Sequence, residues 1–298
     1  MVSVKKKSGG HLAGGCKPYL FLLPFVLSFL LFFVVPAVYS IFLSFTKYPG
    51  YGAYKWVGLQ NYKNLLSYPR FWAAFGRTVF YWLAHFVPVT VISFLLAVCI
   101  RTKTVSRASK VVKPILFIPQ ICAVTATALV FQILFAGKTG TINQLFGTSI
   151  AWLENAAYTK WVVVLLLIWR SVGWFMVVYL SGLTSVPDDV LEAARIDGAS
   201  AWQSMIRVTI PILKPTFLFA FLMDAISSWR MYTEIAVLTA TEVGNISREG
   251  AEGVINLMII NLRSGSFGMA SAYGWILFLI TFMISMFMLR LFRNKESA

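Results

Sequence analysis

Six long apolar runs constrain this chain more than any other feature of its sequence. They cover approximately residues 19–46, 75–100, 111–135, 161–183, 213–238 and 269–292. A helix needs roughly 20 predominantly apolar residues to cross a bilayer, and every run reaches that length. The chain is 58% hydrophobic and only 12% charged, whereas an ordinary soluble domain carries about 25% charged residues. The sequence therefore predicts an all-α integral membrane protein with six transmembrane helices.

The segments outside these runs add little soluble mass. Residues 1–18 form a short tail rich in lysine and glycine, which we expect to be disordered, and residues 19–298 form a single membrane domain. The first apolar run is too long for the core of a signal peptide and no small-residue cleavage site follows it, so we expect it to remain as an anchor. A weaker apolar patch at 254–262 is short and flanked by charge, which favours an interfacial or re-entrant segment.

Basic residues set the predicted orientation of the spans. If the N-terminal tail is cytoplasmic, the inside segments hold fifteen lysines and arginines and the outside segments hold nine. The clearest inside segment is 101–113, with five basic residues and no acidic residue. Because positive charge is retained on the cytoplasmic side, both termini and the segment 185–212 are predicted to be cytoplasmic. Basic loops facing anionic lipid also explain the net charge of +15 better than nucleic acid does, since no compact basic domain exists to bind it.

The sequence shows no set of residues for catalysis or metal binding. The cysteines and histidines have no metal-ligand or redox spacing: Cys16, Cys99, Cys122, His11 and His85. A partial echo of a phosphate-binding loop at Gly137-Lys138-Thr139 has Gln132 in place of its leading glycine and no preceding strand. We therefore expect a chain that is not an enzyme, holds no metal or cofactor and does not hydrolyse ATP itself.

One polar segment between the fourth and fifth apolar runs favours short helices. It reads Leu191-Glu192-Ala193-Ala194-Arg195-Ile196-Asp197-Gly198-Ala199. Pro187 suits the first turn of a helix, and the acidic residues that follow it lie near the positive end of the helix dipole. Gly198 is a natural helix stop. A second helix is predicted from Ala199 or Ser200, and two prolines, Pro211 and Pro215, end it. The residues that share one of its faces at helical spacing are Trp202, Met205, Ile206, Thr209 and Ile210.

This combination resembles the signature loop of permease subunits in ATP-binding-cassette importers. The matching residues are Glu192, Ala193, Ala194, Asp197, Gly198, Ala199, Ile210, Pro211, Leu213 and Pro215, while Met205 stands where many members have Phe. Other segments resemble the carbohydrate importers over nearly the whole chain: Phe21-Leu22-Leu23-Pro24, Pro36, Ser44-Phe45, Val57-Gly58-Leu59-Gln60-Asn61-Tyr62, Pro119, Gly140, Asn143 and Gly182-Leu183. The opening span is similar to that of the first of two unlike permeases that usually pair.

The resemblance implies a multi-pass permease subunit in the bacterial cell membrane that forms half of a sugar or oligosaccharide pathway working by alternating access. It also implies the partners: a second homologous permease, a cytoplasmic ATPase dimer that binds ATP and Mg, an extracellular or periplasmic solute-binding protein, the carbohydrate and membrane lipids. In this family the loop docks in a groove of the ATPase. The residues expected to couple to it are Glu192, Ala193, Ala194, Arg195, Asp197, Gly198 and Ala199.

Ionisable residues inside apolar runs are costly and tend to face water or the interior of a helix bundle. The sequence places Arg170 in the fourth run and further candidates for a substrate pathway in the fifth: Asp224, Trp229, Arg230, Tyr232 and Glu234. Arg230 and Glu234 lie four residues apart, so they would share a helix face and pair. That pair would either line a polar, aromatic sugar pathway or lock the fifth span to a neighbour. For Asp224 the sequence does not decide between these two roles, and for Arg170 it favours the structural one.

The residues leave a second class of function open. An ion-coupled secondary transporter acting without an ATPase would use Asp224 and Glu234 as proton or cation sites. Six spans without a visible repeat, together with a docking-type loop, argue against it. The mixed charge at Arg230 and Glu234 is compatible with neutral sugars, uronides or glycerophosphate-like solutes.

Overall fold

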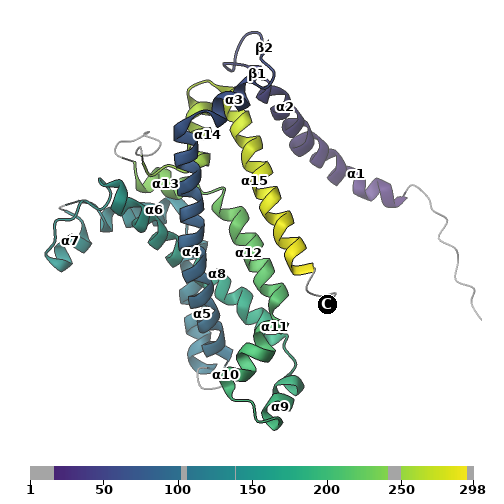
Figure 1. Cartoon of the computed structure of the whole chain (residues 1–298), viewed down its shortest axis with the longest axis vertical. Coiled ribbons are helices and arrows are strands. Elements are labelled where there is room, and N and C mark those ends of the chain that lie inside the picture. The colour runs from purple at the N-terminus through teal and green to yellow at the C-terminus, as the bar shows by residue number, and fades with distance from the viewer. Residues whose placement is uncertain (1–16, 102–105, 138, 241–249, 294–298) are drawn as a thin grey trace, which may run out of the picture.

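The structure is a computed structural model that describes residues 17–101, 106–137, 139–240 and 250–293. Most of the predicted tail and the basic residues Lys5, Lys6, Lys7 and Lys103 lie outside the described residues, as does Lys138 of the phosphate-loop echo. The described part is almost entirely helical (Figure 1). Its two strands, β1 (Thr46–Lys47) and β2 (Lys55–Trp56), form one antiparallel hairpin.

Four helical segments are long and apolar enough to cross a membrane. They are the continuous run of α1 (Lys17–Phe29), η1 (Leu30–Val34) and α2 (Val35–Ser44), then α4 (Pro69–Arg101), α8 (Ala156–Thr184) and α15 (Phe267–Arg293). The number rises to six if each of two bent helix pairs counts as one span. Six is also the number of spans predicted from the sequence, but the second bent pair joins Ala201–Ile212 to Lys214–Ser228 and so differs in its bounds from the predicted fifth run.

Two of the predicted spans are interrupted. The run at 111–135 divides into α5 (Ser106–Ile121) and α6 (Val124–Leu134), which meet at 94°. The run at 213–238 divides into α12 (Lys214–Ser228) and α13 (Thr233–Leu238). The prediction of one continuous helix was therefore wrong in both places, because hydropathy records how apolar a segment is and not whether its backbone stays helical.

Shorter helices connect these segments. They are α3 (Gln60–Leu66), α7 (Thr141–Phe146), α9 (Asp188–Ile196), α10 (Ala201–Ser204), η3 (Met205–Thr209), α11 (Ile210–Ile212) and α14 (Val254–Arg263). The apolar patch predicted at 254–262 is α14, a helix of 10 residues and too short to cross a bilayer.

The packed core lies between α4, α8 and α12. Buried apolar side chains from α4 and α8 make up most of one core cluster, a second joins these two helices to α6 and α13, and a third joins α4 to α14 and α15. Helix α5 approaches α8 so closely at Gly173 that an added Cβ would overlap the carbonyl oxygen of Leu116. By contrast, none of the most apolar window of the first helical run is buried within the chain, and α1 projects away from the other helices (Figure 1).

Candidate functional site

Four ionisable residues of the apolar runs come from four different helices. His85 lies on α4, Arg170 on α8, Asp224 on α12 and Glu234 on α13. The packing of α4, α8 and α12 brings them together although they are up to 149 positions apart in the chain. They form two ion pairs, of which the His85–Asp224 pair is ionic only when the imidazole is protonated.

Arg170 and Glu234 form the first pair. The Arg170 Nη1 atom lies 3.0 Å from Glu234 Oε1, and the two side chains are only 10% and 15% exposed. The predicted pairing of Glu234 with Arg230 was wrong, because α12 ends at Ser228 and Arg230 lies in the non-helical segment before α13. The two residues therefore do not share a helix face, and a side chain from another helix neutralises Glu234.

His85 and Asp224 form the second pair. The His85 Nε2 atom lies 3.0 Å from Asp224 Oδ1, and both side chains are almost fully buried. The other ring nitrogen, Nδ1, lies 3.3 Å from the carbonyl oxygen of Tyr81. This role of His85 was not predicted from the sequence. The signal was present, however, because a lone His and a lone Asp in two apolar runs each need a partner at membrane depth.

A cavity of about 280 Å³ lies beside the two pairs. Its polar and aromatic lining comes from α4, α5, α8, α12 and α13 and comprises His85, Gln120, Arg170, Ser171, Trp174, Phe175, Asp224, Ser227, Ser228 and Glu234. Three lining residues have a buried polar atom without a hydrogen-bond partner among the described residues: Arg170 Nε, Asp224 Oδ2 and Ser228 Oγ. Native proteins rarely leave such atoms unpaired, so the cavity has the character of a site for a polar ligand.

The other residues predicted to line the pathway lie elsewhere. Trp229 is buried, with its ring 5.5 Å from that of Phe75, and Tyr232 accepts a hydrogen bond from Arg263 Nη2 at 3.2 Å. Arg230 lines a second cavity of about 480 Å³ between α12, α14 and α15, whose other lining residues are mostly apolar. Of the five predicted residues, Asp224 and Glu234 share the polar cavity, and Trp229, Arg230 and Tyr232 do not line it.

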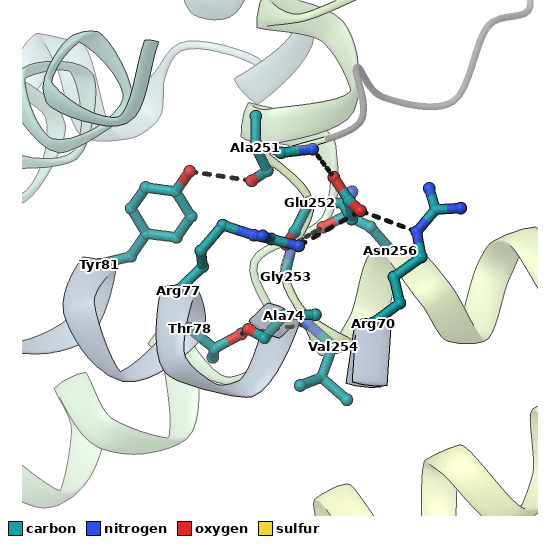
Figure 2. Close-up of polar contacts among 11 residues, drawn as sticks. Arg70, Ala74, Arg77, Thr78, Tyr81, Ala251, Glu252, Gly253, Val254 and Asn256 are labelled. Atoms are coloured by element: carbon teal, nitrogen blue, oxygen red, sulfur yellow. Dashed lines mark hydrogen bonds and ion pairs between the residues drawn. The ribbon is translucent and has the colours of Figure 1, made fainter. Parts of the chain in front are cut away.

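A third charged cluster joins α4 to the start of α14 (Figure 2). The buried carboxylate of Glu252 accepts hydrogen bonds from Arg70 Nε at 2.9 Å and from the backbone N–H of Gly250 at 2.7 Å, and Arg77 Nη2 lies 3.2 Å from it. Arg77 Nε also donates to the carbonyl oxygen of Glu252 at 2.8 Å, and the Tyr81 hydroxyl donates to that of Ala251 at 2.8 Å. Glu252 was not predicted from the sequence, because it lies outside the apolar runs.

The predicted coupling loop is formed by α9, Gly198 and the helical run from α10 to α11. Gly198 has φ +76°, a backbone conformation that favours glycine, and it turns the chain out of α9. Ser200 then caps α10 in a reciprocal arrangement with Gln203, in which each side chain bonds the other's backbone N–H. The prediction of two short helices meeting at a glycine is confirmed. Pro211 does not end the second helix, which continues to Ile212 before the chain bends into α12.

This loop exposes side chains rather than packing them. No residue of α9 is buried, and the apolar side chains of Ile196 and Trp202 are 81% and 71% exposed. Glu192, Ala193, Arg195, Asp197 and Gly198 are exposed as well, and Ala194 and Ala199 are partly buried.

Next to the loop, α8 and α12 approach closely at Gly182. An added Cβ there would lie 2.6 Å from Thr216 Oγ1. The loop is thus joined to the two helices that carry Arg170 and Asp224. Among the described residues, no group of three or more His, Cys, Asp or Glu side chains is placed to hold a metal.

Comparison with solved structures shows the fold. The chain superimposes with a TM-score of 0.80 on a chain of a bacterial alginate ABC transporter, solved in complex with an alginate pentasaccharide-bound periplasmic protein. The two chains are 21% identical, and the match covers 93% of this chain and 94% of that one. At this identity the likeness establishes the architecture alone.

Sequence comparison establishes the family. The arabinooligosaccharides transport system permease protein AraP of Bacillus subtilis is 32% identical over 92% of this chain and 88% of that protein. The probable ABC transporter permease protein YesP of the same organism is 30% identical over 96% and 93%. The family described as "binding-protein-dependent transport system inner membrane component" matches residues 89–296. The chain therefore belongs to this family, as a multi-pass membrane permease of the sugar ABC transporter type.

Proposed function

We propose that this chain forms half of the translocation pathway of an ATP-driven importer for an oligosaccharide. The observation that carries the proposal is the polar cavity between α4, α8 and α12, in which two ion pairs and three unpartnered polar atoms surround about 280 Å³. A small-molecule site is usually lined by aromatic and other apolar side chains together with a small number of precisely placed polar groups. We assign this cavity as the solute site of the chain.

Energy enters through the loop formed by α9 and α10. Its exposed apolar side chains, Ile196 and Trp202, have no packing partner within the described chain that covers them, which suits insertion into a groove of another protein. We assign that groove to a separate cytoplasmic ATPase dimer, which binds ATP and Mg, whereas this chain binds no cofactor of its own. Movement of the loop reaches the cavity through α8 and α12. These two helices flank the loop in the chain and pack against each other at Gly182.

The remaining parts of the assembly follow from the same proposal. Six spans place both termini and the coupling loop in the cytoplasm, with α5 and α6 together counted as the third span and α12 with α13 as the fifth. A second, homologous permease completes the pathway, and an external solute-binding protein delivers the solute. The pathway opens alternately to either side. The relatives named for arabinooligosaccharides and for starch degradation products favour an oligosaccharide over a monosaccharide.

Reconstitution tests this function directly. The chain, its second permease, the ATPase and the binding protein are placed in proteoliposomes, and uptake of labelled oligosaccharides is measured with and without ATP. We expect uptake that needs both ATP and the ATPase. Uptake that persists without the ATPase and follows an ion gradient would instead support the secondary transporter, with Asp224 and Glu234 as its ion sites.

A further inference from the structure

The two ion pairs at the polar cavity share an unusual arrangement. In each pair, one polar atom is held by the partner and another has no partner among the described residues. Asp224 Oδ1 lies 3.0 Å from His85 Nε2, while Asp224 Oδ2 is unpartnered. Arg170 Nη1 lies 3.0 Å from Glu234 Oε1, while Arg170 Nε is unpartnered. Each pair therefore fixes the orientation of a side chain and leaves one of its polar atoms, an acceptor on Asp224 and a donor on Arg170, without a partner among the described residues.

A third unpartnered atom lies beside the acceptor. Ser228 follows Asp224 by four residues on α12, so the two side chains lie on the same face of the helix. The Ser228 hydroxyl, which both donates and accepts, is buried and has no partner among the described residues. Trp174 and Phe175 of α8 line the same cavity and add aromatic surface. Acceptor, donor, hydroxyl and aromatic rings together match a sugar ring, whose hydroxyls donate and accept hydrogen bonds.

The charge of the lining limits which sugars fit. The cavity is lined by two carboxylates, one guanidinium and one imidazole, so its charge is negative when His85 is neutral and zero when His85 is protonated. In neither state does it carry a net positive charge. The Arg170 guanidinium is already engaged by Glu234, and Arg230, the other arginine of this region, lines a different cavity. A carboxylate on the solute would face Asp224 and Glu234 without a cation of its own.

From these observations we propose that the cavity binds a neutral sugar unit and discriminates against uronic acids. Asp224 Oδ2 accepts a hydrogen bond from a sugar hydroxyl, Arg170 Nε donates one, and Ser228 completes the set. His85 acts on the solute through Asp224: it is a positioning residue that holds the carboxylate by Oδ1 and leaves Oδ2 for the solute. This inference rests on the proposed function, because it names the substrate class of the same site.

Protection of a cysteine in the cavity tests the substrate class on the assembled transporter without the binding protein. Ser227 is exposed in the cavity, and Ser227→Cys is introduced after Cys16, Cys99 and Cys122 are replaced by Ser. Neutral trisaccharides of galactose, glucose and arabinose are compared with trigalacturonate, which matches galactotriose except for its carboxylates. We expect a neutral trisaccharide to slow thiol labelling and trigalacturonate to give no protection. Stronger protection by trigalacturonate, or none by any sugar, would overturn the inference.

The same cysteine reports the charge of the cavity without any sugar. Its labelling rates with a cationic and an anionic methanethiosulfonate are each divided by the reagent's rate with a free thiol in solution. We expect the cationic reagent to react at least as fast as the anionic one on this scale. A tenfold preference for the anionic reagent would mean a positive cavity and would contradict the proposal.

Substitutions of His85 separate positioning from folding. His85→Ala removes the partner of Asp224 Oδ1 and is expected to weaken neutral-sugar protection about tenfold, the effect of losing one well-placed bond to a charged group. His85→Gln keeps an N–H donor and is expected to restore protection to within about threefold. Glu154→Gln, an exposed carboxylate outside the cavity, is the control for a change of charge.

Two outcomes distinguish a failure of this inference from a failure of the proposed function on which it rests. If His85→Ala and His85→Gln lose protection equally while both complexes assemble and melt like the unaltered protein, His85 does not position Asp224 and the inference fails. ATP-dependent uptake of a sugar would still stand in that case. Loss of ATP-dependent uptake for every sugar by the unaltered complex would instead refute the proposed function.

Discussion

The cluster at Glu252 and the cavity at Asp224 both bury a carboxylate, and they use it differently. Each polar atom of the Glu252 carboxylate has a partner: Oε1 meets Arg70 and Arg77, and Oε2 accepts from the Gly250 N–H. The Asp224 carboxylate uses one oxygen for His85 and leaves the other unpartnered among the described residues. A satisfied buried charge holds two helices together, whereas a half-satisfied one beside a cavity is available to a ligand.

The comparison predicts its largest effect at the satisfied cluster. Glu252→Ala leaves two guanidinium groups without their carboxylate and releases the start of α14 from α4. Breaking a buried pair costs several kcal/mol, and because Arg70 and Arg77 are partly exposed we expect about 3 kcal/mol here. Thermal unfolding of the detergent-solubilised protein measures this loss. Glu154→Gln should melt like the unaltered protein, and an unchanged Tm for Glu252→Ala would break the comparison.

The coupling loop extends the comparison to a region with almost no buried surface. Proline fixes φ near −65° and cannot adopt the +76° of Gly198. Gly198→Pro therefore redirects the chain between α9 and α10, and we expect it to reduce ATP-driven uptake to less than about a tenth while the helices of the core remain folded. Uptake and co-purification of the ATPase are the measurements.

Gly198→Asn is the matched control for the proline variant. Asn tolerates positive φ better than most residues, so this variant should retain most of the uptake. Normal uptake together with normal ATPase co-purification in Gly198→Pro would contradict a coupling role for the loop.

A third prediction concerns the ion pair at the cavity. Glu234→Gln leaves Arg170 buried without its counter-charge, and we expect uptake to fall about tenfold with a loss of about 1–2 kcal/mol in stability. The double variant Arg170→Gln with Glu234→Gln removes both charges and should recover stability but not uptake. Melting and uptake of the two single variants and the double variant form a cycle. Recovery of both quantities together would mean that the pair is structural and does not bind the solute.

The smallest effect is expected at Arg230. Its side chain is exposed, lines the apolar cavity rather than the polar one, and has no hydrogen bond or ion pair recorded within the described chain. Arg230→Gln should change stability by less than about 0.5 kcal/mol and uptake by less than about twofold. The measurement is the same pair of assays. A loss of uptake as large as that of Glu234→Gln would show that Arg230 belongs to the solute pathway and that the two cavities act as one site.

The sequence was sufficient to predict the structural elements that depend on local signals. Apolar runs predicted the long helices α4, α8 and α15, and the turn at Gly198 followed from residue type alone. The need of buried charges for partners was also visible at Asp224 and Glu234. The identity of those partners could not be predicted, because His85 and Arg170 lie on other helices and only tertiary packing brings them close.

Backbone breaks were the second thing that composition did not reveal. Residues 229–232 read Trp-Arg-Met-Tyr, and neither a proline nor a glycine marks the break between the two helices. The break is stabilised from outside the segment, for example by Asn256 Nδ2, which lies 3.5 Å from the Tyr232 carbonyl oxygen. A side chain 24 residues further along the chain carries no local signal of this role.

The same break divides the cavity between two mechanical units. Asp224 and Ser228 belong to α12, which continues from the coupling loop, whereas Glu234 belongs to α13, which packs against α6. Under the proposed function, a push on the coupling loop acts directly on α12 and only indirectly on α13. A tilt of α12 alone changes the distance between the acceptor on Asp224 and the donor that Glu234 holds in place on Arg170. The proposed binding of a solute is then tied to the angle of one helix, so that release would need no separate gate.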